Sequence, residues 1–486
     1  MSDENSTDDK VFLLLDCEDG NQTFADGVAL DAIVSDVWPS MLPPKVQTGY
    51  LFDENADANS LALQKWGVIV PEGDRGKELF GFISDLVAWR EKEQGPKVVP
   101  FQVKPDMDAA AAQDWVVNTL SAIDKDERPR YLLILGDLHE VSAELQLALS
   151  TRYFVGRLAF SDEADYRAYV EKVIESEKNG PTLERGKALV YVVRRNEFPA
   201  QKAIEDAENN LITPLLTKSN ERYEKGKIPV KFDQKNESAP SSASKDDFLK
   251  IVRDAPVSSL LLSVSHGKGA NPDKPEAERR TNQGALCFDD KTFVTAEDVR
   301  DGKFLPRGFW FLFACYGAGT PKRSAYQHWG SQGNVSCLPK EGENPYIAAL
   351  PKAALANPEG PLAIVGHLDL AWVSSYSNVA GFRNQPTRFA DLADIANKKA
   401  WRRVGPIFGD FIRDLVDINS KITNTIDAEK AGSSPSMTIG DRTRLWMLRQ
   451  DLAAYILLGD PAAYLPFPRN VPPPARADSS DDNGAS

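Results

Sequence analysis

The feature that most constrains this chain is the alternation of short apolar runs with longer amphipathic stretches. Such alternation predicts a mostly parallel β-sheet covered by helices on both faces. In sheets of this kind, functional loops lie at the carboxyl ends of the strands. The apolar runs of strand length include Val11–Leu15, Val98–Val103, Tyr131–Leu135, Ala188–Val193, Ile228–Phe232, Ser259–Val264, Gly308–Ala314 and Pro361–Leu368.

Helices are expected between these runs and after the last of them. Amphipathic or Ala-rich spacing predicts them over Ala109–Ile123, Glu163–Lys178, Ala200–Glu224, Lys245–Arg253, Arg388–Asp427 and Arg442–Leu457. We therefore expect an N-terminal α/β subdomain over residues 11–180 and a second, catalytic subdomain over residues 186–466. The polar residues 1–10 and the Pro-, Asp- and Ser-rich residues 467–486 are predicted to be disordered.

Charge and hydropathy exclude several classes of protein. The chain has 57 Lys and Arg against 71 Asp and Glu, a net charge of −14, which disfavours binding of nucleic acid through its phosphates. No apolar run approaches the roughly 18–20 residues of a membrane span. The first ten residues lack the basic and apolar regions of a signal peptide, so we expect a cytoplasmic protein.

The four cysteines do not form a disulfide framework in a chain of 486 residues. They stand at positions 17, 287, 315 and 337, without a Cys-x-x-Cys pair, and the chain has only four histidines. Ligands for a structural zinc would be clustered, and no cluster is visible at the usual spacing. We therefore expect no metal and no other cofactor.

Two predicted strands end in a chemically competent residue next to glycine. One is Leu260-Leu-Leu-Ser-Val-Ser-His266-Gly267, and the other is Phe309-Trp-Phe-Leu-Phe-Ala-Cys315-Tyr-Gly317. A parallel sheet would place both ends at one edge, where the His266 imidazole could withdraw the proton of the Cys315 thiol. Either motif alone is more often packing or a plain turn, but the two together favour a site.

Together these segments resemble the clan CD cysteine peptidases, which include caspases, gingipains, separases and CHAT domains. The clan pattern is an apolar block before His-Gly and a later apolar block before Ala-Cys, here Ser265-His266-Gly267 and Phe313-Ala314-Cys315. The gingipain-type C25 family is the most similar group. Further segments of this likeness are Tyr131–Asp137, Tyr153–Leu158, Tyr169–Glu177, Pro361–Gly366 with Ala371-Trp372, and Leu457–Pro461.

The resemblance covers roughly Arg130 to Leu465 and implies a caspase/gingipain-like three-layer αβα sandwich with two side-by-side subdomains. It also implies residue roles. His266 would be the general base and Cys315 the nucleophile, with the amides of Gly267 and Cys315 as the oxyanion hole. Trp372 would form an aromatic wall of the substrate pocket.

Two positions remain open. Gingipains carry an acidic residue that orients the histidine shortly before the Gly-Arg segment, but here the chain reads Ser150-Thr-Arg-Tyr153, which leaves the third catalytic residue unassigned. Asp162 is a candidate to select a basic substrate side chain, although an acidic helix start explains it equally well.

The expected function is that of a cysteine endopeptidase that cleaves a protein or peptide substrate through a thioacyl-enzyme. By analogy it would be a bacterial intracellular protease activated in stress or defence, with a pore-forming or other defence-system partner. Two alternatives stay open: a catalytically inactive caspase-like scaffold or interaction module, and a non-peptidase Cys hydrolase or acyltransferase.

Overall fold

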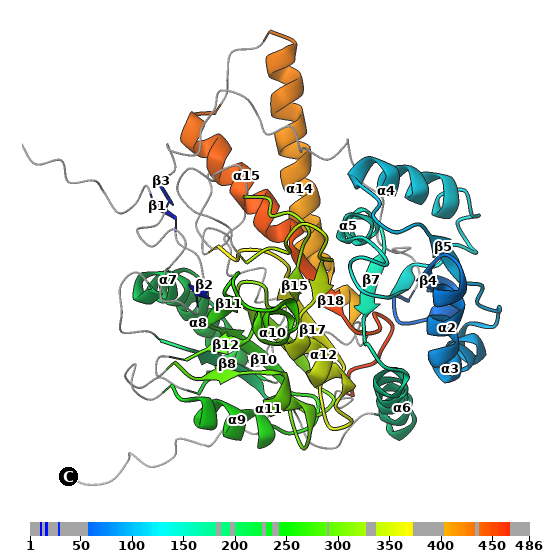
Figure 1. Cartoon of the computed structure of the whole chain (residues 1–486), viewed down its shortest axis with the longest axis horizontal. Helices are drawn as coiled ribbons and strands as arrows, with labels where there is room; N and C mark the ends of the chain where they lie inside the picture. Colours follow the sequence, from blue (N-terminus) through cyan, green and yellow to red (C-terminus); the bar gives the residue numbers. More distant parts are fainter. Residues whose placement is uncertain are drawn as a thin grey trace, which may run out of the picture.

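A ten-stranded β-sheet forms the centre of the molecule (Figure 1). The computed structural model describes residues 10–11, 15–17, 28–29, 57–180, 186–194, 200–225, 230–235, 243–288, 291–326, 337–372, 403–432 and 437–466. The strand order is β5-β4-β6-β7-β18-β17-β14-β10-β8-β9. The strands are β4 (Trp66–Pro71), β5 (Phe101–Val103), β6 (Tyr131–Leu135), β7 (Phe154–Leu158), β8 (Ala188–Val192), β9 (Phe232–Gln234), β10 (Leu260–Val264), β14 (Phe309–Phe313), β17 (Ala363–His367) and β18 (Tyr455–Leu458).

The sheet consists of two parallel halves joined by one strand from the end of the described chain. β4 to β7 pair in parallel with one another, and so do β17, β14, β10, β8 and β9. β18 lies between the halves, antiparallel to β17, and meets β7 at the pair Leu458–Arg157. Within the sheet, the two halves are therefore joined through β18. The helix Glu163–Asn179 adds a contact outside it, since Lys172 donates to the carbonyl oxygen of Leu355 in the helix that precedes β17 (2.6 Å).

Helices cover both faces of the sheet, as the alternation predicts. On β6, Leu132 and Ile134 enter a small core with Leu145 and Leu149, whereas Leu133 and Leu135 enter the main core, which shows the two-residue period of a strand buried on both sides. The helices are α1 (Leu61–Gln64), α2 (Asp74–Phe82), α3 (Ser84–Gln94), α4 (Ala109–Trp115), α5 (Ala143–Ser150), α6 (Glu163–Asn179), α7 (Ala200–Ala207), α8 (Thr213–Glu224), α9 (Lys245–Arg253), α10 (Glu276–Asn282), α11 (Ala296–Arg300), α12 (Ala349–Ala356), α14 (Gly405–Lys430) and α15 (Ile439–Ala453).

Three small sheets complete the described elements. One has the order β13-β12-β11-β2, with β2 (Leu15–Cys17), β11 (His266–Gly269), β12 (Leu286–Cys287) and β13 (Phe293–Val294). The others pair β15 (Gly319–Thr320) with β16 (Tyr346–Ile347), and β1 (Lys10–Val11) with β3 (Val28–Ala29). The four-stranded sheet matters most for the site, because β11 begins at His266.

The structure corrects several predicted boundaries. The helix expected over Arg442–Leu457 ends at Ala453, and Tyr455–Leu458 is the strand β18, because these four residues are buried against both halves of the sheet. The expected helix over Ala200–Glu224 contains a π-helical turn at Glu208–Ile212. β4 was not predicted. Residues 1–9, 467–486 and 388–402, for which predictions were also made, lie outside the described residues.

A buried ion-pair network fixes the segment that follows β18. Arg90 on α3 pairs with Asp460 (2.7 Å) and with Glu177 on α6 (2.7 Å). Asp460 also accepts the indole N–H of Trp66 (3.0 Å), and its own amide donates to the hydroxyl of Tyr169 (2.6 Å). These carboxylates compensate the positive charge of Arg90, which is fully buried and would otherwise be costly to remove from water.

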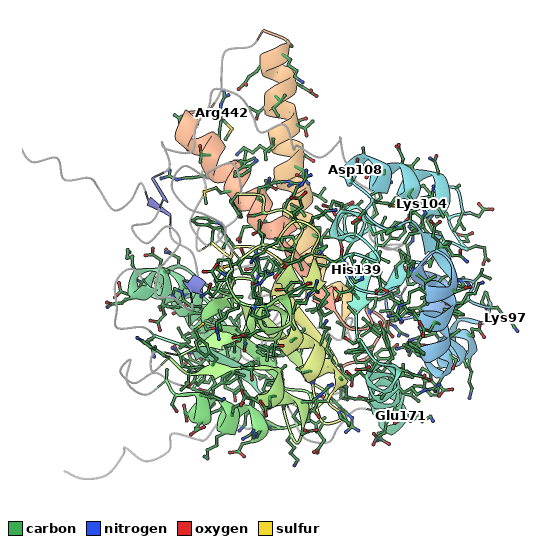
Figure 2. All side chains as sticks on the ribbon, viewed as in Figure 1. Lys97, Lys104, Asp108, His139, Glu171 and Arg442 are labelled. Carbon is green, nitrogen blue, oxygen red and sulfur yellow. The ribbon has the colours of Figure 1, made fainter. Side chains whose placement is uncertain are left out.

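The helices α14 and α15 form a hairpin that rises from the body of the molecule (Figure 1). Arg442, which Figure 2 labels near the outer end of this hairpin, pairs with Glu429 and so joins the two helices. Over the described parts of the chain, no helix combines the length and the apolar character that crossing a membrane requires.

The Arg90–Glu177 pair makes a prediction about acid stability. Burial alone would raise the pKa of Glu177, but Arg90 outweighs it and lowers that pKa below its usual value. The pair therefore stabilises the fold above the unfolded pKa of about 4.3, and this contribution is lost as pH falls through the folded pKa. Glu177→Gln should reduce the free energy of unfolding by about 3 kcal/mol at pH 7. The gap between the variant and the natural chain should close in acid, and thermal melts between pH 7 and pH 3 measure it. A gap that stays constant over this range would contradict the assignment.

Candidate active site

Cys315 and His266 follow the carboxyl ends of two neighbouring parallel strands. β10 and β14 pair in a register that ends with Val264 opposite Phe313, and each candidate stands two residues beyond that pair. The amide of Ser265 donates to the carbonyl oxygen of Phe313 (3.1 Å) and so continues the pairing past the strand ends. The sheet thus places both residues at matching positions on adjacent strands.

Two glycines allow the backbone around Cys315 to pack closely. A Cβ atom on Gly267 would lie 1.9 Å from the carbonyl oxygen of Cys315 and 2.9 Å from its amide nitrogen. Gly284, with a φ of 80°, lies against the carbonyl of Tyr316, where a Cβ atom would come within 2.2 Å of the oxygen. No side chain larger than that of glycine fits either position without movement of the Cys315 turn.

The chain reverses direction directly at Cys315. The amide of Gly317 donates to the carbonyl of Ala314 (3.2 Å), and Tyr316 between them has a φ of 56°. A turn of this kind normally places Gly or Asn at that position, and a residue held there against its preference costs about 1–3 kcal/mol. Tyr316 is fully buried, and its amide donates to the carbonyl of Asp369 (3.0 Å). The packing therefore maintains a strained backbone beside the thiol, which is typical of functional sites.

The sulfur of Cys315 contacts the segment that follows β17. The amide of Ala371 donates to Sγ (3.1 Å), and Sγ lies 3.7 Å from the carbonyl oxygen of the same residue. An N–H group aimed at sulfur stabilises negative charge on it. Cys315 is 0% exposed and His266 is 2% exposed, so a reagent reaches them only after neighbouring residues have moved.

His266 also belongs to the small sheet beside the site. It begins β11 and is the Cα partner of Cys287 on the antiparallel strand β12. Cys287 is fully buried, with its thiol directed at the carbonyl of Ala285 (3.8 Å). The strand β12 thus supports the backbone of His266, and Cys287 is a core thiol in this position.

A buried histidine–aspartate pair lies behind the turn. Nε2 of His367, at the end of β17, lies 3.1 Å from Oδ1 of Asp451 on α15, and Nδ1 lies 2.8 Å from the carbonyl oxygen of Asp369. Burial alone would lower the pKa of His367, but the Asp451 carboxylate and the neighbouring Asp369 together outweigh it and raise that pKa above its ordinary value. Burial also raises the pKa of the Asp369 carboxyl.

Trp372 lies next to the site in sequence and is fully buried. Its ring packs against Tyr326, with centroids 5.3 Å apart, and Tyr326 in turn packs edge-on against Trp446 of α15 (5.9 Å). The amide of Trp372 donates to Oδ1 of Asp451 (2.9 Å). In this conformation the indole is a core side chain one residue after the contact with the Cys315 sulfur.

Asp162 is exposed at the residue before α6, where its side chain makes no capping bond. In the same turn, Asp165 pairs with Arg300 on α11 (3.2 Å). The start of α6 therefore contacts α11. Neither this ion pair nor a capping bond brings Asp162 to Cys315. Residues Ser150–Tyr153, which precede the Gly-Arg segment and contain no acid, form the end of α5 and the start of the loop before β7.

Sequence reasoning missed Asp369 and Ala371, which contact the Cys315 turn, and Asp451, which contacts His367 and Trp372. Asp369 and Ala371 follow the predicted strand Pro361–Leu368, and the position of Trp372 in the same segment was an available signal. Asp451 lies in a helix far along the chain, where nothing in the sequence distinguishes it from a surface residue. Within the described ranges, no group of three or more His, Cys, Asp and Glu side chains is placed to hold a metal ion.

Comparison with known proteins gives similarity at the level of structure only. No family model and no curated protein sequence matches the chain. One similar structure is described as a protease, with 13% identity, a TM-score of 0.47, and coverage of 86% of this chain and 80% of the other. Another is the complex of the pro- and mature domains of Porphyromonas gingivalis RgpB, with 17% identity, a TM-score of 0.44, and coverage of 82% and 79%.

The close approach of Gly267 can be tested by a single methyl group. Gly267→Ala should displace the Cys315 turn, because the new Cβ atom meets backbone on the facing segment. We expect a loss of a few kcal/mol in stability, as for other overpacked sites, and a changed alkylation rate of the Cys315 thiol. Gly81→Ala is the matched control, since its Cβ atom meets nothing within 4 Å in α2 and should stabilise the helix by about 1 kcal/mol. Equal melting temperatures for the two variants would refute the close contact.

The role of Trp372 can be tested separately. Because the side chain of Trp372 is fully buried, Trp372→Ala should lower the free energy of unfolding by about 3–5 kcal/mol. Chemical denaturation measures this loss. Unchanged stability together with a lower kcat/KM for peptides would instead identify the indole as a wall of the substrate pocket.

Proposed function

We propose that this protein is a cysteine peptidase in which Cys315 is the nucleophile and His266 the general base. The observation that carries the proposal is the register of β10 and β14, because His266 and Cys315 each follow the last residue pair of these adjacent strands by two positions. The strained turn at Tyr316 and the close contact of Gly267 with Cys315 support it. A structural cysteine would need neither.

In the proposed reaction, His266 takes the proton of the Cys315 thiol and the thiolate attacks the carbonyl carbon of a peptide bond. The amides of Gly267 and Cys315 hold the negative charge that develops on the carbonyl oxygen. The amine leaves with the proton from His266, and a thioacyl-enzyme remains. Water, activated by the same imidazole, then releases the acyl group as a carboxylate.

The full burial of Cys315 favours a second candidate, an inactive scaffold in which the pair carries out no chemistry. The two functions differ in their response to a thiol-reactive peptide probe. A peptidyl acyloxymethyl ketone should label the peptidase at residue 315 and should leave the scaffold unlabelled. A panel of matched amide and ester substrates distinguishes a peptidase from a non-peptidase Cys hydrolase or acyltransferase.

Substitution of the thiols gives the decisive comparison. Cys315→Ala should abolish both probe labelling and peptide hydrolysis, because only the reacting atom is removed. Cys287→Ala is the matched control, since Cys287 is equally buried and is paired with His266 across β11 and β12. This control should keep its activity and lose about 1 kcal/mol of stability through a small cavity. Equal loss of activity in both variants, with unchanged melting temperature, would contradict the choice of nucleophile.

A further inference from the structure

Besides His266, a second set of buried groups surrounds the Cys315 turn. The segment from His367 to Trp372 contacts the turn at two points: the amide of Ala371 donates to Sγ of Cys315 (3.1 Å), and the carbonyl of Asp369 accepts the amide of Tyr316 (3.0 Å). The sulfur and the strained residue that follows it therefore depend on the position of one short loop.

That loop is held in turn by Asp451. One oxygen of its carboxylate accepts the amide of Trp372 (2.9 Å) and lies 3.1 Å from Nε2 of His367. The other ring nitrogen of His367 lies 2.8 Å from the carbonyl oxygen of Asp369. Asp451 is thus linked to the Tyr316 contact by hydrogen bonds through His367 and Asp369, and to the Ala371 contact through the amide of the next residue, Trp372.

Burial strengthens these hydrogen bonds. His367 and Asp451 are both 0% exposed, and Asp369 is 4% exposed, so water does not replace a bond that is broken. The Asp451 carboxylate also raises the pKa of His367. Nε2 lies 3.1 Å from Oδ1 and 3.1 Å from the carbonyl oxygen of Asp451, and Nδ1 lies 2.8 Å from the carbonyl oxygen and 3.1 Å from the amide nitrogen of Asp369, so each ring nitrogen contacts one of the two aspartates.

We propose that Asp451 and His367 are positioning residues for the Cys315 nucleophile. They act through the loop: the pair orients the amide of Ala371 toward the sulfur and holds the turn at Tyr316 in its strained conformation. This inference rests on the proposed function of Cys315, and it adds to the site a residue from α15. Groups that support a reacting residue from behind typically change activity 10–100-fold when they are removed.

Variants at residue 451 separate the parts of this role. Asp451→Ala removes the acceptor for the Trp372 amide and the partner of His367. Asp451→Asn keeps an oxygen for the amide and loses only the charge. We expect about a hundredfold lower kcat for Asp451→Ala with little change in KM, and a smaller loss for Asp451→Asn, because misplacement of a reacting atom affects kcat.

The matched control is Asp460→Asn. Asp460 is also 0% exposed and ion-paired, with Arg90, but it lies in a different network. This variant should lower the melting temperature without changing kcat per folded molecule. A loss of kcat in Asp460→Asn equal to that in Asp451→Ala would show a general effect of instability and would overturn the proposal.

A second measurement is independent of peptidase activity. The rate of Cys315 alkylation by iodoacetamide at pH 7.5, followed by mass spectrometry of the Cys315 peptide, should fall about tenfold in Asp451→Ala and remain unchanged in Asp460→Asn. A changed rate without any peptide hydrolysis by the natural chain would retain the positioning role and reject the proposed function. Normal hydrolysis and alkylation in folded Asp451→Ala would reject the positioning role alone. An alkylation rate that rises, or a thiol that reacts in neither protein, would also overturn it.

Discussion

The buried ion pair between Arg90 and Asp460 anchors the strand that joins the two halves of the sheet. It fixes the chain directly after β18, the strand that separates β7 from β17. Gly459, with a φ of 117°, makes this possible, because a Cβ atom there would lie 2.6 Å from the carbonyl oxygen of Leu362. The segment Gly459-Asp460-Pro461 therefore connects the two halves of the molecule.

The candidate active site depends on the same sheet through its register. β14 is held between β10 and β17, and each of these neighbours continues past its end into a segment that contacts Cys315. Gly267 approaches the backbone of Cys315 from the β10 side, and Ala371 approaches the sulfur from the β17 side. The nucleophile candidate thus occupies a turn that is constrained by both neighbouring strands, and its strained conformation is maintained by packing that the sheet provides.

The sequence was sufficient to predict the α/β class, the strands β10, β14 and β17 and the two residues at their ends, because buried parallel strands are short apolar runs bounded by glycine. It was not sufficient for β18, because Tyr455–Leu458 continues an amphipathic helical pattern and becomes a strand only through burial between distant strands. Asp451 was missed for a related reason. Asp451 matters through its contacts with His367 and Trp372, which are remote in sequence. Local sequence patterns do not predict such contacts.

The position of β18 also determines when the native sheet can assemble during synthesis. β4 to β7 and the strands from β8 to β17 emerge from the ribosome well before residues 455–458, so the central position stays empty while most of the chain is already available for folding. Until β18 is made, β7 and β17 present unpaired backbone edges, which readily pair with other chains. Contacts of such large sequence separation also form slowly. The two halves can therefore join into one native sheet only after residues 455–458 have been synthesised.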